Sequence, residues 1–321
     1  MRQIVCGEIQ TSVLGFGCGS VLGRVGRSAS LRAMNSAWDA GITLFDTARS
    51  YGYGEAESLL GEFLRGKREQ AVVATKYGLT PRRLGALERI ALPFARLARQ
   101  APGVRTLQRR SSPQSAIGDF TADGLRASVE TSLRALQTDR IDLLFLHEAT
   151  ADAIGQHDLL AALDALRREG KLKRAGLYAS AEVVAACIAN APPVIGAMQF
   201  GANLFHPLTS AIAQNNRNGM LLIANHPFGG PERVARFRAS LSAIAADEST
   251  PTQLRRKLHD SDPQAWLEAL FGALLNGSGI HSLVFSMMCQ DHLRANIRAV
   301  ESCRFSADEL ELICARLRPD A

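Results

Sequence analysis

The sequence predicts one (β/α)8 barrel, a TIM barrel, with an N-terminal hairpin, an insert after the third strand and a C-terminal capping helix. Eight short apolar segments alternate with segments in which apolar residues recur at helical spacing. Most of the connections between them are short. Polar residues also gather at the carboxyl ends of the predicted strands, the face on which such barrels carry their active sites: Asp46, Lys76, His147, Gln199, Asn225, His226 and Ser286.

The first half of the barrel follows from alternating strand and helix patterns. A hairpin is expected over 3–11, followed by barrel strands at 13–17, 42–46, 71–76 and 141–147. Helices are expected between them, the first from Ser28 as N-cap to Gly41, another ending near Gly66, and a third from about Thr121. The glycines after the first strand do not complete a G-x-G-x-x-G motif, which argues against a dinucleotide-binding βαβ unit.

The second half continues the same alternation. Strands are expected at 174–179, 194–200, 220–227 and 280–286. The expected helices lie at 159–170, 181–190, 207–217, 263–275 and 291–300, with a capping helix at 306–317. A long loop is expected over 228–260. The chain is therefore interpreted as one barrel domain, residues 1–321, with lid-like insertions at about 80–118 and 228–260.

The composition and the cysteine pattern are those of an ordinary globular protein. The chain has 321 residues, 46% hydrophobic and 21% charged, a size at which α/β barrels form one domain. No apolar run approaches the ~20 residues of a membrane span, and no signal peptide is expected. The six cysteines include no C-x-x-C pair, which favours free thiols in the cytoplasm and no metal site.

The positive charge of the chain is concentrated in one segment. The window from Pro81 to Arg110 holds eight arginines and one acid, Glu88, so its net charge is +7. Because the whole chain has a net charge of +6, the rest of the chain carries about −1. This insert is interpreted as a solvated amphipathic lid, a lid that attracts an anionic substrate or cofactor phosphates, or a surface for a partner. Phe94 is its lone aromatic residue, which argues against stacking on single-stranded nucleic acid.

Four of the residues near strand ends form a set suited to carbonyl chemistry. A tyrosine titrates near ~10, too high for efficient proton transfer at neutral pH. The Lys76 ammonium is expected to lower the pKa of Tyr51, with Asp46 holding the lysine. His147 is expected to orient a carbonyl oxygen. The set can deliver a proton to an alkoxide as it forms.

These residues lie in runs that resemble the aldo-keto reductase superfamily: DTARSYGYGEAESLLG, VVATKYG, DLLFLHEA, LRREGKLKRAGL and AMQF. The similarity extends from about Leu14 to the 290s. The resemblance implies a barrel that binds NADP(H) in extended form, with NAD(H) as a second possibility, and hydride transfer from the nicotinamide. It also implies Tyr51 as the proton donor.

The resemblance implies further cofactor contacts, at positions where this chain departs from the family pattern. Gln199 would contact the nicotinamide carboxamide. The family's Ser-Asn pair after the fifth strand is replaced by Tyr178-Ala179, with Ser180 as a substitute, and its aromatic residue under the nicotinamide by Asn225. Ser286 stands where the family has Gly or Lys near the adenosine phosphates, His292 falls near the family's basic residue for the 2′-phosphate, and Asn296 matches its asparagine. His226, next to Asn225, is interpreted either as a pocket-lining or core histidine or as a substrate or cofactor contact.

Two functions remain open from the sequence. The first is an NAD(P)H-dependent oxidoreductase acting on a small carbonyl compound or sugar, possibly anionic, without nucleic-acid or membrane partners. The second is a barrel that serves as a binding or regulatory subunit with little turnover. The sequence leaves the oligomeric state open.

Overall fold

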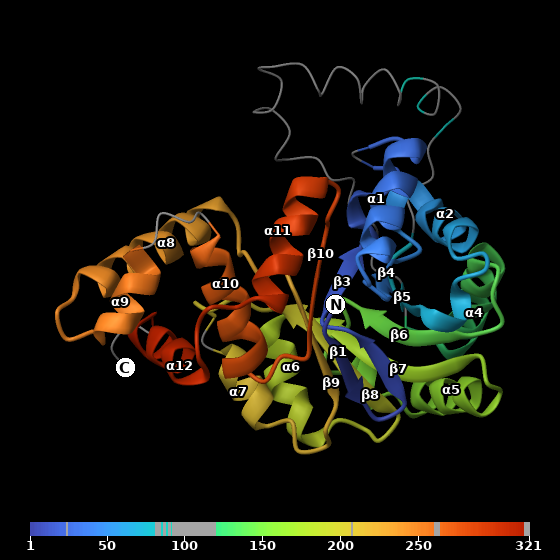
Figure 1. Cartoon of the computed structure of the whole chain (residues 1–321). Helices are drawn as coiled ribbons and strands as arrows, with labels where there is room; N and C mark the ends of the chain where they lie inside the picture. Colours follow the sequence, from blue (N-terminus) through green and yellow to red (C-terminus); the bar gives the residue numbers. More distant parts are fainter. Residues whose placement is uncertain are drawn as a thin grey trace.

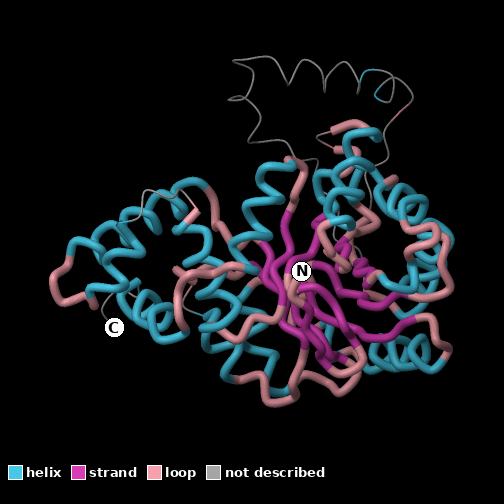
Figure 2. Tube along the Cα trace, viewed as in Figure 1, coloured by secondary structure: helices cyan, strands magenta, loops and turns pink. Residues whose placement is uncertain are grey.

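Eight parallel strands close into a barrel, so the predicted fold class is confirmed. The computed structural model describes residues 1–23, 25–80, 120–206, 208–259 and 264–317, together with residues 85, 88 and 91 (Figures 1 and 2). The strands follow chain order around the barrel, and the last pairs with the first. Their bounds are β3 Leu14–Gly17, β4 Leu44–Asp46, β5 Val72–Tyr77, β6 Ile141–His147, β7 Leu172–Ala179, β8 Ile195–Gly201, β9 Leu221–Asn225 and β10 Ser282–Phe285.

The predicted hairpin closes the barrel at the end where its strands begin. Strands β1 (Gln3–Cys6) and β2 (Ile9–Ser12) pair antiparallel. Cys6 and Ile9 from this hairpin pack into the apolar cluster of the barrel interior, beside Leu44 and Val72 at the starts of their strands. The opposite end, where the strands finish, is the end that carries the predicted site residues.

Helices surround the barrel on the outside (Figures 1 and 2). The described helices are α1 Arg27–Asp39, α2 Ala56–Phe63, α4 Ala122–Leu136, α5 His157–Arg168, α6 Ala181–Cys187, α7 Leu208–Gln214, α8 Pro231–Ala246, α9 Thr252–His259, α10 Ala265–Gly272, α11 Gln290–Glu301 and α12 Ala307–Leu317. A π-helical turn, Ala273–Gly277, extends α10. Within the described residues, no helix is both long and apolar enough to cross a membrane.

The prediction of a long loop over 228–260 is wrong. Most of this stretch forms α8 and α9, which lie with α10 and α12 to one side of the barrel (Figure 1). Proline at the first position of α8 suits a helix start. Phe237, Leu241 and Ile244 then recur at helical spacing and are buried. The Gly-Gly-Pro run before it is the turn that leads into this helix.

Two of the predicted helix starts have different outcomes. Thr121 caps α4 as expected, because its Oγ1 accepts a hydrogen bond from the Gly124 amide at 3.1 Å. Ser28 is not the N-cap of α1, which is Gly26, so that prediction is wrong. Ser30 stabilises this helix start, since its hydroxyl donates to the Gly26 carbonyl at 3.0 Å. The predicted insert at 80–118 lies almost entirely outside the described residues.

Replacing Gly61 with alanine is expected to destabilise the barrel by about 1–3 kcal/mol. A Cβ at this position of α2 would lie 2.6 Å from the Leu136 carbonyl, so backbone must move to admit it. Urea unfolding of Gly61→Ala, with Gly66→Ala as the control variant, measures this loss of stability. Gly66 has open space around its Cβ position but adopts a φ of +75°, so the stability lost in Gly66→Ala measures backbone strain alone. Equal stability of Gly61→Ala and the parent chain would contradict this account of α2–α4 packing.

Candidate active site

The carboxyl ends of three neighbouring strands place the predicted catalytic residues together. Asp46 is the last residue of β4, Lys76 lies near the end of β5 and His147 is the last residue of β6. Tyr51 follows β4 in a short 3-10 turn, Tyr51–Gly54. The turn requires glycine at position 52, where φ is +58° and a Cβ would lie 2.9 Å from the Val21 carbonyl.

Asp46 and Lys76 form a buried ion pair. Lys76 Nζ donates to Asp46 Oδ1 at 2.6 Å and to the Thr47 carbonyl at 2.8 Å. Lys76 is 1% exposed and Asp46 5% exposed. A buried ammonium is tolerated only when such partners replace its water, so the pair holds the lysine in one position.

Lys76 lies beside two tyrosine rings and His147 completes the group. Lys76 Nζ is 5.0 Å from the centroid of the Tyr51 ring and 5.7 Å from that of Tyr178. The Tyr51 and His147 rings are 6.3 Å apart, edge to face at 86°. The structure therefore brings together all four residues that the sequence singled out.

The electrostatics of Tyr51 differ from the prediction. Burial raises the pKa of Tyr51 well above its usual range, and the negative charges of Asp46 and Glu148 add to the effect. The expected lowering of the Tyr51 pKa by Lys76 is therefore not seen, because burial and these negative charges raise the pKa of the phenol. The phenol therefore stays protonated at neutral pH, and it can give up this proton only to a more basic oxygen, such as a developing alkoxide.

His147 is neutral in this environment. Burial, together with the positive charge of Lys76, lowers the pKa of His147 to about 3. The neutral imidazole carries one N–H, which can donate a hydrogen bond to a carbonyl oxygen.

Folding stability is expected to fall as the pH drops from ~6.5 towards 3. In this window the unfolded chain protonates His147, whereas the folded chain, with a pKa of about 3, does not. The free energy of unfolding then decreases by up to ~1.4 kcal/mol per pH unit. Urea unfolding at several pH values, with His147→Phe as control, measures this slope. An identical slope in the two proteins would contradict the buried neutral imidazole.

Tyr178 also lies in the site, although the sequence assigned it no role. In the barrel register it is the neighbour of His147 on one side and of Gln199 on the other. Its ring contacts His147 edge to face, with centroids 4.8 Å apart at 90°. Burial raises the pKa of Tyr178 to about 12. The sequence could have indicated this role, because alternate residues of a strand face the same side and Tyr178 lies at an inward-facing position of its strand.

Two buried amide side chains on the other side of the barrel have unpaired oxygens. Among the described residues, Gln199 Oε1 and Asn225 Oδ1 accept no hydrogen bond. Gln199 is 1% and Asn225 8% exposed. Buried acceptors usually have a donor, so both oxygens fit a ligand that carries an N–H group. A carboxamide, such as that of nicotinamide, is such a ligand.

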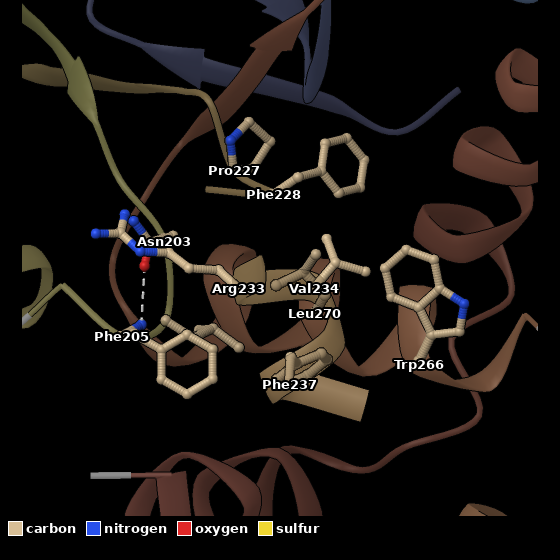
Figure 3. A pocket seen from close by; sticks show the side chains of 10 residues that line it. Asn203, Phe205, Pro227, Phe228, Arg233, Val234, Phe237, Trp266 and Leu270 are labelled. Carbon is tan, nitrogen blue, oxygen red and sulfur yellow. Dashed lines mark hydrogen bonds between the residues drawn. The ribbon is translucent and has the colours of Figure 1, made fainter. Parts of the chain in front are cut away.

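A pocket of about 520 Å³ adjoins these amides at the ends of β8, β9 and β10. His226 and Ser286 line it, as does Arg233, which the sequence reasoning missed. Arg233 and Asn203 also line a second pocket beside it, shown in Figure 3, whose wall includes Phe205, Phe237 and Trp266. A guanidinium at the rim of this pocket can hold a phosphate.

The remaining predicted cofactor residues do not line this pocket. Ser180 is exposed and caps α6, where its Oγ accepts from the Val183 amide at 3.4 Å. His292 and Asn296 lie four residues apart on α11, His292 exposed and Asn296 buried.

Comparison with known proteins gives a consistent result. The aldo/keto reductase family model matches residues 13–316. D-threo-aldose 1-dehydrogenase of a Pseudomonas species is 36% identical over 178 residues, which cover 51% of this chain and 49% of the relative. Pyridoxal 4-dehydrogenase of Microbacterium luteolum is 32% identical over 186 residues, which cover 53% and 52%. The chain thus spans about half the length of the curated relatives it matches.

The fold has a close counterpart among solved structures. The holo form of an aldo-keto reductase from Bacillus halodurans superposes with a TM-score of 0.68 and 21% identity, covering 100% of this chain and 97% of that chain. At this identity the likeness concerns the fold. With the family model matched over nearly the whole sequence, this chain belongs to the aldo/keto reductase family.

Proposed function

We propose that this chain is an NAD(P)(H)-dependent oxidoreductase that interconverts a carbonyl compound and its alcohol, with Tyr51 as general acid and base. The observation that carries the proposal is the buried Asp46–Lys76 pair beside the protonated phenol of Tyr51 and the neutral imidazole of His147. Membership of the aldo/keto reductase family supports the same reaction class.

Each residue of the set has a defined task in carbonyl reduction. A reduced nicotinamide, when bound, supplies the hydride. Tyr51 donates its O–H proton to the carbonyl oxygen as negative charge develops there. The Lys76 ammonium stabilises the phenolate left on Tyr51, and Asp46 holds the ammonium in place. The imidazole N–H of His147 donates a hydrogen bond that orients the carbonyl oxygen. The reverse steps serve alcohol oxidation.

The unpaired amide oxygens support a nicotinamide cofactor. Gln199 Oε1 and Asn225 Oδ1 would accept hydrogen bonds from the carboxamide nitrogen. Arg233, His226 and Ser286 around the adjoining pocket would face the phosphates. We favour NADP(H), with NAD(H) as the alternative.

The substrate is proposed to be a small aldehyde, ketone or sugar. The two reported relatives are named for an aldose and for pyridoxal, both of which carry a carbonyl group. Cys6, Cys18, Cys187, Cys289 and Cys303 are free thiols, which supports the reducing cytoplasm as the compartment.

A binding or regulatory subunit is the second candidate. It is favoured by the bulky Tyr178, which stands where the family has serine. A fluorescence titration with NADPH and with NADH, combined with turnover of a panel of aldehydes, ketones and sugars, separates the two functions. Cofactor binding with turnover supports the oxidoreductase. Tight binding without turnover supports the regulatory subunit, and no binding of either nucleotide refutes both.

A further inference from the structure

The imidazole of His147 is held by ring contacts. Within the described part of the chain, no other residue forms a hydrogen bond with this imidazole. A histidine that must point a single N–H at a substrate oxygen needs some other restraint on its ring. The residues that can provide it are the two tyrosines that contact His147 edge to face.

Of these two rings, Tyr178 is the closer and the more firmly seated. Its centroid lies 4.8 Å from that of His147, compared with 6.3 Å for Tyr51. Both distances fall in the range of attractive edge-to-face contacts, but the shorter one packs more tightly. Tyr178 stands on a barrel strand and is the direct Cα neighbour of His147. Tyr51 stands on a loop turn with left-handed residues at 52 and 53.

The surroundings of Tyr178 anchor its ring from below. It packs on the apolar cluster that fills the barrel interior, which includes Phe145 and Ile223. The ring therefore forms part of the floor of the site and covers the apolar interior beneath it. Its position beside Gln199 extends this floor to the amides of the proposed carboxamide site.

We propose that Tyr178 is a positioning residue whose ring holds the imidazole of His147 in the orientation that presents its N–H to the substrate carbonyl. The inference concerns an aromatic contact rather than a hydrogen bond, so the ring matters and the hydroxyl does not. The inference rests on the proposed function only in assigning the N–H of His147 to a substrate carbonyl. The contact itself is present without any ligand.

The charge state of His147 reports whether the contact is intact. The imidazole is surrounded by titratable and charged groups from three elements and from its own strand end: Lys76, Tyr51, Tyr178 and Glu148. Lys76 opposes protonation and is itself paired with Asp46. Removing the Tyr178 ring admits water beside the imidazole, and hydration favours its protonated form.

The test compares Tyr178→Phe, Tyr178→Leu and Tyr178→Ala with the parent chain. Phenylalanine keeps the ring, leucine keeps apolar bulk without a flat ring, and alanine opens the space. Imidazole nitrogen and carbon resonances are followed by NMR from pH 4 to 8, with His147→Asn used to assign the signal of His147. Thermal unfolding confirms that each variant is folded, and kcat and KM are measured with the best substrate of the panel.

The expected NMR result is specific for the ring. His147 stays neutral down to pH 4 in the parent chain and in Tyr178→Phe. In Tyr178→Ala it titrates within the window, with a midpoint moved towards ~6.5. Tyr178→Leu and Tyr178→Ala are expected to lose at least tenfold in kcat/KM, and Tyr178→Phe less than twofold.

Two results would overturn the inference. One is an unchanged His147 titration and kcat/KM in both Tyr178→Leu and Tyr178→Ala. The other is an equal loss in Tyr178→Phe, which would assign the role to the hydroxyl. If the parent chain turns over no carbonyl substrate, the proposed function fails. The NMR comparison still decides whether Tyr178 holds His147.

Discussion

Replacing Tyr51 with phenylalanine is expected to lower kcat by about 10²–10⁴-fold, because the reaction loses its proton donor. Cofactor affinity and folding stability should hardly change. Among the described residues, the Tyr51 hydroxyl forms no hydrogen bond, and its ring contacts with Lys76 and His147 are retained by phenylalanine. Steady-state kinetics, a fluorescence titration with NADPH and thermal unfolding measure the three quantities separately.

Tyr53 provides the matched control for this substitution. It lies in the same 3-10 turn, two residues away, with a φ of +60°. Tyr53→Phe removes the same hydroxyl from the same loop and is expected to retain kcat within about twofold. If Tyr53→Phe abolishes turnover while Tyr51→Phe is fully active, the proton donor has been assigned to the wrong tyrosine.

Replacing Lys76 with methionine is expected to reduce both activity and stability. The buried carboxylate of Asp46 loses its counter-ion, and breaking a buried pair in this way costs about 3–5 kcal/mol. The phenolate of Tyr51 also loses the ammonium that stabilises it, so kcat should fall by about 10²-fold or more. Urea unfolding measures the loss of stability, and steady-state kinetics measure the loss of kcat.

The double variant Asp46→Asn with Lys76→Met separates the two effects. Removing both charges leaves no unpaired ion in the barrel, so its free energy of unfolding should exceed that of Lys76→Met. Its kcat should remain as low as that of the single variant. Recovery of activity in the double variant would contradict the role of the ammonium. Stability losses that simply add would contradict the buried ion pair.

The barrel could be predicted from the sequence because its strands are buried on both faces. Such strands read as short apolar runs, and the helices between them carry apolar residues at a different period. The strand Ile141–His147 was predicted with its observed bounds. The helix α8 was missed because Gly229, Gly230 and Pro231 mark a turn, and its sparse apolar stripe begins only after them.

The residues of the site could be predicted, but their electrostatics could not. Strand ends place Asp46, Lys76 and His147 on one rim whatever the details of packing. The raised pKa of Tyr51 depends on how much water the fold excludes, which no sequence spacing specifies. The contact between Tyr178 and His147 depends on strand register in the same way, because register alone decides which inward side chains are neighbours.

The most direct test of the proposed reaction follows the hydride itself. The protein is incubated with a carbonyl substrate from the panel and NADPH or NADH deuterated at both C4 positions of the nicotinamide, and the alcohol product is analysed by mass spectrometry and NMR. We expect one deuterium on the former carbonyl carbon of the product, formed by the parent chain and far more slowly by Tyr51→Phe. Deuterated cofactor that binds tightly but yields no labelled alcohol with any substrate would contradict hydride transfer on this barrel.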